Sequence, residues 1–400
     1  MGLSSDIGFL VLSSALLGVC THVWLNRFEP VAPTKVLSVL LAASATILLL
    51  HNLSFAPSFL TIFTSYAAYL LSLTLSLVIY RLSPLHPLAK YPGPPIATLT
   101  DFWGAWQFWN GHQHTVTKAL RDRYGPIIRV APNKLSIVDV DIVSFVLSTT
   151  GLPKGQSYDT RQDPNAPGNL FVLKGKEHAA RRRLWTRGMN PESLKEYEGI
   201  LRARVSQLVD RLGEVSTGGA LDIATWLGYS SFDFTGDMAF GGVGYELMKA
   251  GSDEHSIWDV ILNSNRTGAV LGHMPWATKL FILIPGFFTD LLKLRKMGIQ
   301  FATARLKKGS TVKDLWHHLA DDANLEKTKP SFGNVVADGA FTIVEGSDTS
   351  TTVLTAFFYY MLQHPEYMRE VQAEIDGVYA RGGDAFDELK NAANVPFLTA

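Results

Sequence analysis

Residues 340–350 read Ala-Phe-Thr-Ile-Val-Glu-Gly-Ser-Asp-Thr-Ser, and a mostly apolar stretch follows as far as Gln363. We interpret residues 336–362 as one helix. Glu345 and Thr349 are then four residues apart and share one side of that helix. An unpaired carboxylate buried on an apolar side costs on the order of several kcal/mol, or else stays protonated. We therefore expect some compensation for Glu345.

The composition excludes several classes of function. The chain has 400 residues with 36 basic and 36 acidic side chains, so no net charge favours nucleic acid as a partner. Its single cysteine, Cys20, allows no intrachain disulfide and no cysteine cluster for zinc or an iron–sulfur centre. Hydrophobic residues make up 47% of the chain and charged ones 18%, so we expect a local excess of apolar sequence.

That excess lies at the start of the chain, where residues 1–83 contain three apolar runs. The runs cover residues 8–25, 36–50 and 55–80, each near the length that crosses a hydrocarbon core. The middle run is short, so one to three helices cross the membrane in this interpretation. Residues 101–400 contain no run of ~18 apolar residues, which argues against a transporter. We predict that residues 1–83 form a membrane anchor.

Basic residues flank these runs unevenly. Arg27 and Lys35 lie between the first and second runs, no Lys or Arg lies between the second and third, and Arg81 and Lys90 follow the third. By the positive-inside rule, this bias places the bulk of the protein in the cytosol. A cleaved signal peptide is the alternative, but it needs a basic start, and the start has only Asp6.

The remaining sequence divides into a linker and a globular part. Residues 84–96 are rich in proline, which fixes φ and denies helix, so we predict a stiff extended hinge. Residues 97–400 have the pattern of a mixed globular domain. We predict an amphipathic helix over 112–124, strands over 127–130 and 134–138 with a turn over 131–133, and long helices after Glu177. The expected fold class is mainly α with a small β-sheet (α+β).

Three segments, in this order, resemble cytochromes P450 of the fungal microsomal type. They are Tyr91-Pro-Gly-Pro-Pro95, Tyr124-Gly-Pro-Ile-Ile-Arg129 and residues 340–350. The last is similar to the I-helix of that family, whose core is Ala or Gly, then Gly, any residue, an acid, Thr, and Thr or Ser. The resemblance implies an incomplete cytochrome P450 catalytic domain behind the anchor, with heme b as its cofactor.

The resemblance also implies a heme-thiolate monooxygenase that hydroxylates or oxidises an apolar small molecule in secondary metabolism. Electrons would come from NADPH through a separate NADPH–cytochrome P450 reductase. The catalytic domain would face the cytosol from the endoplasmic reticulum membrane. Residues 159–171 and the stretch around Trp276 would line the substrate pocket, and the largely apolar residues 268–288 would fall in the family's F–G region, which dips into the bilayer.

The same resemblance assigns roles to residues of the I-helix stretch. Thr349 and Asp348 fall on the alcohol and acid that deliver protons to iron-bound oxygen. Gly346 would let the helix bulge open beside that oxygen. Glu345 matches the fatty-acid omega-hydroxylase branch, where a glutamate can form an ester with a heme methyl. The alternative for Glu345 is a shifted helix register that turns it toward a basic neighbour.

A purely structural explanation of the stretch is a buried helix whose hydroxyl groups hydrogen-bond back to helix carbonyls. We expect this behaviour of four hydroxyl residues, Ser347, Ser350, Thr351 and Thr352. For Asp348 and Thr349 we favour the functional explanation, because the other family segments occur in the family's order.

Residues 175–185 read Gly-Lys-Glu-His-Ala-Ala-Arg-Arg-Arg-Leu-Trp and lie where the family has its C-helix. There a Trp and a basic residue four positions later bind a heme propionate from one helix face. His178 takes the Trp position and Arg182 the basic one, with Arg181 as an alternative register. The structural alternative is a solvated basic face, which would also suit docking of an acidic reductase.

The end of the chain matches only part of the family's pattern. Residues 369–376 look like the J-helix and residues 394–400 like the lead-in to the K-helix. The Glu-x-x-Arg of the K-helix and the heme-binding cysteine loop are absent, and Cys20 in the first apolar run cannot supply the thiolate. We therefore expect no metal ligand in these residues and no activity from the chain as given. A truncated gene product or isoform, a decayed paralogue, and a non-catalytic membrane-anchored binding or scaffolding protein remain alternatives.

Overall fold

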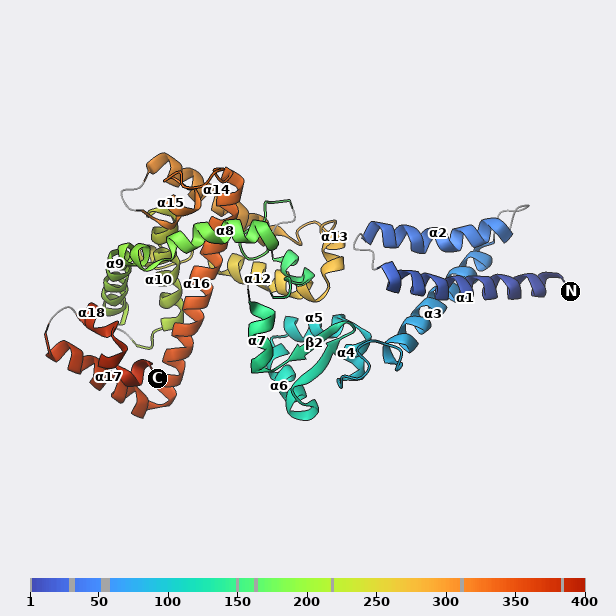
Figure 1. Ribbon diagram of the computed structural model, residues 1–400, viewed down its shortest axis with the longest axis horizontal. Coiled ribbons are helices and arrows are strands. Elements are labelled where there is room, and N and C mark those ends of the chain that lie inside the picture. Colours follow the sequence, from blue (N-terminus) through green and yellow to red (C-terminus); the bar gives the residue numbers. More distant parts are fainter. Residues whose placement is uncertain are drawn as a thin grey trace. The chain divides into compact units, whose positions relative to one another are not determined.

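The computed structural model describes residues 2–28, 33–51, 58–148, 151–161, 165–216, 219–309, 313–382 and 385–399. The chain divides into two compact units, one of Met1–Ala166 with Leu262–Leu292 and one of Pro167–Ile261 with Lys293–Ala400. The described residues are mainly helical with one two-stranded sheet, which confirms the expected fold class (Figure 1).

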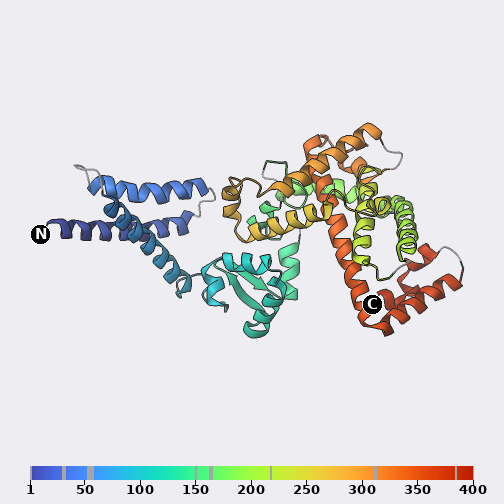
Figure 2. The ribbon, with the colours of Figure 1, turned by 180° about the vertical axis from the view of Figure 1, so that it is seen from behind.

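The first unit begins with the helices of the apolar runs. These are α1 (Gly2–Phe28), α2 (Pro33–His51) and α3 (Phe59–Leu82). Residues 52–57, where the third run was expected to begin, lie outside the described residues. Two stretches, Ile7–Phe28 and Phe59–Leu82, are long and apolar enough to cross a membrane, and a shorter apolar stretch, Thr34–Ala43, lies in α2. Both views of the ribbon show α2 lying alongside α1 (Figures 1 and 2).

The proline-rich segment differs from the extended hinge that we expected. Residues 83–91 fold into successive turns, with hydrogen bonds such as Ala89 N–H to His86 O at 2.9 Å. Only the following residues are extended, and there Pro92 O accepts the Arg129 N–H at 2.8 Å. The Arg129 guanidinium donates to Arg81 O at 3.0 Å, at the end of α3. The segment is therefore held to the sheet by hydrogen bonds.

Beyond the linker lie short helices and the sheet. The helices are α4 (Pro95–Leu99), α5 (Phe102–Trp109), α6 (Gln113–Tyr124) and α7 (Val140–Leu147). Strands β1 (Ile127–Ala131) and β2 (Lys134–Ile137) pair antiparallel, with Ile127 opposite Ile137. The predicted helix, strands and intervening turn are thus confirmed to within a residue.

Three further short elements complete the first unit. They are η1 (Gln156–Thr160), η3 (Pro275–Ala277) and α13 (Thr278–Phe281). Helix α12 (Ile257–His273) and helix α14 (Thr289–Lys308) each contribute residues to both units. A small apolar cluster packs Ala105 of α5 against Met274 and Ala277.

The second unit is a bundle built around α10 and α16. Its other helices are α8 (Gly175–Gly188), α9 (Pro191–Val215), α11 (Leu247–Ala250), α14, α15 (Leu315–Leu319), α17 (Pro365–Ala380), α18 (Ala385–Leu389), η4 (Ala392–Asn394) and α19 (Pro396–Thr399). Most residues of α10 (Ile223–Phe240) are buried, and Phe240 packs its ring against Phe301 and Trp316. The predicted 369–376 helix lies within α17, while Ala400 lies outside the described residues.

Helix α16 (Phe332–Gln363) has clear causes for its two ends. Ser331 precedes it, and the Ser331 hydroxyl accepts the N–H of Asn334. The helix ends at Gln363 because the next residue, His364, precedes Pro365, and a residue before proline is pushed out of the α region. Between these points α16 is α-helical without interruption.

A buried ion pair holds α8 on α16. Arg181 Nη1 lies 2.7 Å from Asp338 Oδ2, and the same atom donates to Asn334 O at 2.8 Å. The second carboxylate oxygen of Asp338 accepts the Leu170 N–H at 2.8 Å. Asp338 is fully buried, so its carboxylate oxygens must accept hydrogen bonds from the protein instead of from water.

This pair makes a stability prediction. Arg181→Met leaves Asp338 buried without its cation, so we expect the free energy of unfolding to fall by about 3–5 kcal/mol. Arg182→Met changes a neighbouring exposed cation and should alter that free energy by less than about 0.5 kcal/mol. Pulse proteolysis of the detergent-solubilised protein in urea measures both values.

A second-site change sharpens the test. Adding Asp338→Asn to Arg181→Met should recover part of the loss, because a neutral amide is less costly to bury than an unpaired carboxylate. Equal stability of Arg181→Met and Arg182→Met would contradict the structural role of the pair.

Candidate functional site

Helix α16 has a packed side and an exposed side. The buried residues are Val335, Val336, Asp338, Gly339, Thr342, Ile343, Val344 and Ser347. Glu345 and Thr349 are exposed, and Asp348 is half-buried. Because α16 is continuous here, Glu345 and Thr349 lie one turn apart on the same side of the helix.

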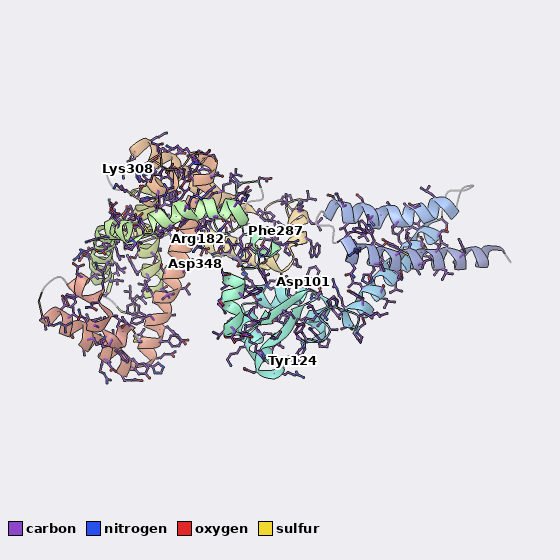
Figure 3. The ribbon with its side chains drawn as sticks, in the orientation of Figure 1. Asp101, Tyr124, Arg182, Phe287, Lys308 and Asp348 are labelled. Carbon is purple, nitrogen blue, oxygen red and sulfur yellow. The ribbon has the colours of Figure 1, made fainter. Side chains whose placement is uncertain are left out.

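Asp338, Glu345 and Thr349 lie on one stripe along α16, because they are spaced by seven and then four residues. The residues around α8 cover this stripe at Asp338, which is fully buried. The stripe becomes exposed at Glu345 and Thr349. The predicted catalytic residues therefore lie further along α16 than the buried Asp338. Figure 3 labels Arg182 on α8 and Asp348 on α16.

The hydroxyl groups on α16 hydrogen-bond differently from our expectation. Thr351 Oγ1 donates to Ser347 O at 2.7 Å, as expected. Thr349 Oγ1 also donates, to the carbonyl oxygen of Glu345. Ser347 Oγ is buried without a hydrogen-bond partner in the part of the chain that the structure describes. In this arrangement the Thr349 hydroxyl donates its proton within the helix. Only the lone pairs of its oxygen are available to accept a hydrogen bond from a ligand.

Gly346 lies against α10. A Cβ at Gly346 would lie 2.7 Å from Thr235 Oγ1 and 2.9 Å from its methyl carbon. The regular helix at this point replaces the bulge that we expected. The missing side chain thus serves close packing of α16 on α10, and a role toward a cofactor remains a prediction.

Three arginines of α8 are held in ion pairs. Arg181 pairs with Asp338, as described above. Arg183 Nη2 lies 2.9 Å from Glu326 Oε2, and Arg187 Nη1 lies 2.9 Å from Asp321 Oδ1. Most of the positive charge of the α8 arginines is therefore neutralised by acidic partners, so these arginines do not form a uniformly solvated basic face.

Arg182 differs from these three arginines. Its side chain is exposed, and its guanidinium has no ion pair within the described residues. His178, one turn earlier on α8, is half-buried. Arg182 is therefore the arginine of α8 that remains available to an anionic ligand, whereas Arg181, the alternative register, is paired with Asp338.

Sequence reasoning missed Asp338. Burial raises the pKa of the Asp338 carboxyl, and the Arg181 guanidinium and the Leu170 N–H oppose that rise. Aromatic packing also joins α8 to α16, because Phe341 of α16 packs against both Trp185 of α8 and Phe171, each at 5.8 Å between ring centroids. The sequence indicated only that Asp338 would lie on the same side of the helix as Glu345 and Thr349.

These residues fit one side of a heme, judged by their donor chemistry. Arg182 offers a cation for a propionate, and Glu345 and Thr349 present polar atoms on an exposed helix stripe. Within residues 1–400 the one cysteine, Cys20, is exposed on α1, which belongs to the other unit. Among the described residues, no group of three or more His, Cys, Asp or Glu side chains could hold a metal ion.

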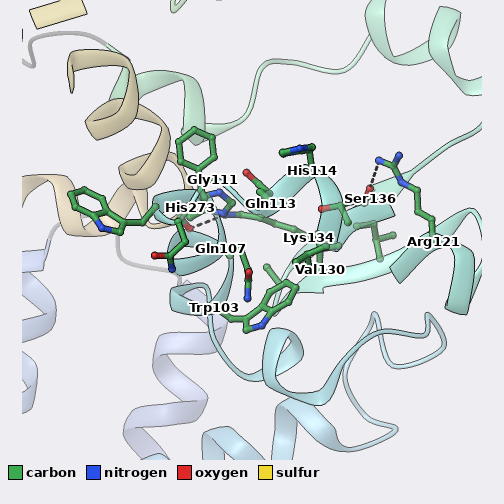
Figure 4. A pocket seen from close by; sticks show the side chains of 18 of the residues that line it. Trp103, Gln107, Gly111, Gln113, His114, Arg121, Val130, Lys134, Ser136 and His273 are labelled. Atoms are coloured by element: carbon green, nitrogen blue, oxygen red, sulfur yellow. Dashed lines mark hydrogen bonds between the residues drawn. The ribbon is translucent and has the colours of Figure 1, made fainter. Parts of the chain in front are cut away.

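A separate cavity of about 1090 Å³ lies in the first unit (Figure 4). Lys134 crosses it to donate to His273 O at 2.8 Å and also pairs with Asp101 at 3.2 Å. Burial, helped by Lys134, lowers the pKa of His273. Nothing in the sequence analysis predicted this cavity, and Asp348 and Thr349 belong to the other unit.

The predicted substrate-pocket residues are divided between the units. Phe171 packs on Phe341 in the second unit, and Trp276 packs on Phe102 in the first at 6.2 Å between ring centroids. Residues 162–164 lie outside the described residues. Trp276 does not line the cavity of Figure 4.

Comparisons with known proteins agree with these features. The chain is 29% identical over 310 residues to Cytochrome P450 67 of Uromyces fabae, covering 76% of this chain and 57% of that protein. It is 29% identical over 384 residues to Cytochrome P450 monooxygenase FCK2 of Fusarium pseudograminearum, covering 91% and 68%. It is 24% identical over 412 residues to Tryprostatin B 6-hydroxylase of Neosartorya fischeri, covering 98% and 72%.

The chain thus spans between 57% and 72% of the length of these three relatives. The sequence model of the cytochrome P450 family matches residues 92–400, from the linker through α19. With this match over most of its length, the chain belongs to the cytochrome P450 family.

Proposed function

We propose that the protein acts as a heme-dependent monooxygenase that oxidises an apolar small molecule in secondary metabolism. The observation that carries the proposal is the exposed α16 stripe with Glu345 and Thr349 beside Asp348 in a chain of this family. Relatives bear the names of a monooxygenase and of a hydroxylase of tryprostatin B. In this proposal the cofactor is heme b, and NADPH supplies electrons through a separate reductase.

Bound heme would supply the activation of dioxygen. When its bond to Glu345 O breaks, the Thr349 hydroxyl would turn and donate its proton in a hydrogen bond to an oxygen of the ligand. Asp348, the preceding residue, would take up a proton from solvent and replace the one that Thr349 passes to that oxygen. Arg182, with His178 one turn away, would bind a propionate through a charge-assisted hydrogen bond.

We further propose that residues 1–83 anchor the protein in the endoplasmic reticulum membrane with residues 97–400 in the cytosol. The apolar helices and the basic residues after the third run support this arrangement. Residues 84–96 then join anchor to catalytic domain. This arrangement would let an apolar, membrane-partitioned substrate reach the enzyme.

Whether the protein supplies a thiolate for heme decides between this function and a second candidate, a non-catalytic membrane-anchored binding protein. Within residues 1–400 the one cysteine, Cys20, lies in the anchor. We expect the 400-residue chain, mixed with heme and reduced under carbon monoxide, to show no thiolate-type Soret band. A form translated from the longest transcript should show that band if it encodes a cysteine loop.

Both outcomes of this measurement are informative. A thiolate-type band from the 400-residue chain would contradict our reading of the ligand set. If the longest transcript encodes no cysteine loop, the catalytic proposal fails and the binding protein remains.

The α16 stripe makes a kinetic prediction for a heme-loaded form. Thr349→Ala and Asp348→Asn each remove a proton-delivery group without touching the ligands of iron. We expect product formed per NADPH consumed to fall on the order of tenfold to hundredfold, with peroxide released instead. Ser350→Ala, at an exposed neighbouring hydroxyl, serves as the matched control and should keep the normal ratio. Unchanged coupling in Thr349→Ala and Asp348→Asn would refute their assignment.

Glu345 has its own test in the same form. On the exposed stripe its carboxylate would face the heme, as an ester to a heme methyl requires. After turnover and acid–organic extraction, we expect heme to remain on the polypeptide. Glu345→Ala and Glu345→Gln should both release it, whereas Asp348→Asn should not. Free extraction from the unmutated enzyme would leave Glu345 as a carboxylate without a covalent role.

A further inference from the structure

Polar side chains join α1 and α3 along a seam between two otherwise apolar helices. Ser14 Oγ lies 2.9 Å from Ser65 Oγ, and both residues are fully buried. The Tyr69 hydroxyl donates to Thr21 Oγ1 at 3.1 Å, and Tyr69 is also fully buried. Such hydrogen-bonded pairs stabilise helix packing in lipid, because a polar side chain there has no water as a hydrogen-bond partner.

The seam establishes the relative direction of the two helices. A third pair, His22 Nδ1 with Ser76 Oγ at 2.7 Å, lies further along both helices. The three pairs are separated in sequence by 51, 48 and 54 residues. Later residues of α1 therefore meet later residues of α3, as in parallel helices. Antiparallel helices would pair later residues of one with earlier residues of the other.

Gly18 lies in the middle of the seam. A Cβ at Gly18 would lie 2.5 Å from the carbonyl oxygen of Tyr69, closer than any real side chain can approach. Close backbone approach at a small residue is typical of paired membrane helices. Gly8, earlier on α1, has no neighbouring atom within 4 Å of its Cβ position. The contact at Gly18 therefore belongs to the seam and is not a general property of α1.

Two parallel helices need a connection that returns the chain to its starting side. Helix α2 provides this return, because it lies alongside α1 and Tyr66 of α3 donates to Leu41 O of α2 at 3.0 Å. Its 19 residues span ~28 Å, close to the ~30 Å of a hydrocarbon core. If α1 and α3 both cross a bilayer, α2 must cross it as well.

The charges at the helix ends agree with three crossings. Arg27 ends α1 and Lys35 begins α2, so that connection carries positive charge. The connection between α2 and α3 contains no Lys or Arg, and Arg81 ends α3. Successive connections thus alternately contain and lack basic residues. The positive-inside rule predicts this alternation for a chain that crosses the membrane three times.

We infer that α1, α2 and α3 cross the membrane three times as one packed anchor, with α1 parallel to α3. The start of the chain and the α2–α3 connection then lie on the side opposite the catalytic domain. The α1–α2 connection lies on the same side as that domain. This inference rests on the membrane attachment proposed above and resolves its number of spans.

Cysteine crosslinking tests the parallel seam in the full chain in microsomes. In the 400-residue chain with Cys20→Ser no native thiol remains, so every disulfide joins engineered residues. Ser14→Cys with Ser65→Cys should crosslink under an added oxidant, because the two oxygens already lie within disulfide reach. A protease site inserted at residues 52–57 and cut after solubilisation shows whether the two fragments stay joined.

A mismatched pair is the control. Ser14→Cys with Ser76→Cys would crosslink only if the helices were antiparallel, so we expect its yield to be at least about tenfold lower. Gly18→Leu should abolish the Ser14–Ser65 crosslink, whereas Gly8→Leu, at an open position of the same helix, should keep it. A stronger Ser14–Ser76 crosslink would overturn the parallel arrangement.

Glycan acceptors test the three crossings independently. An acceptor sequence in an extension before α1, or in a long polar insertion at residues 52–57, should be glycosylated in the endoplasmic reticulum. One inserted at residues 29–32 should not be. All inserted acceptors are read in an Asn52→Gln background, because Asn52-Leu53-Ser54 is itself a native acceptor sequence. The native acceptor sequence at Asn265 in the catalytic part serves as the internal control and should stay unmodified. Glycosylation at residues 29–32, or its absence before α1, would overturn the inference.

The same samples separate this inference from the function on which it rests. If carbonate washing releases the unmodified chain from microsomes, membrane attachment itself fails. If the chain stays attached but crosslinks or glycans follow another pattern, only the three-crossing arrangement fails.

Discussion

The Arg181–Asp338 pair is the contact on which the second unit depends. A fully buried carboxylate is tolerated only with a cation and hydrogen bonds around it, and here the cation comes from a residue 157 positions earlier in the chain. The contact fixes α8 against α16 and so fixes the rotation of α16 about its axis. Because Asp338 faces inward under α8, Glu345 and Thr349 emerge on the same stripe where that cover ends.

The same contact distributes the charges of α8. Arg181 points into the protein, Arg183 and Arg187 reach the acids Asp321 and Glu326, and of these four arginines only Arg182 keeps an exposed cation without an ion pair within the described residues. A run of three consecutive arginines therefore does three different things, as a helix that turns about 100° per residue requires. The unpaired basic surface of α8 is therefore smaller than the sequence alone suggests.

Local patterns explain what could be predicted from the sequence. The strands of the small sheet and the amphipathic helix before them depend on alternation and turn residues within a dozen positions, and they match to within a residue. Asp338 could not be assigned, because its partner lies far away in the sequence. Gly346 was ambiguous for another reason, because a missing side chain suits a bulge and a close helix contact equally well, and here Thr235 lies where the Cβ would be.

The linker shows how the anchor and the sheet become one body within the first unit. Arg129 is almost fully buried, and its guanidinium donates to Arg81 O at the end of α3 and to Pro132 O at the sheet turn. A cation buried among carbonyl oxygens is held firmly, since moving it out would leave those oxygens unsatisfied. The prolines of residues 84–96 stiffen the chain between the same two ends. The orientation of the sheet relative to α3 is therefore set by hydrogen bonds rather than left to a flexible tether.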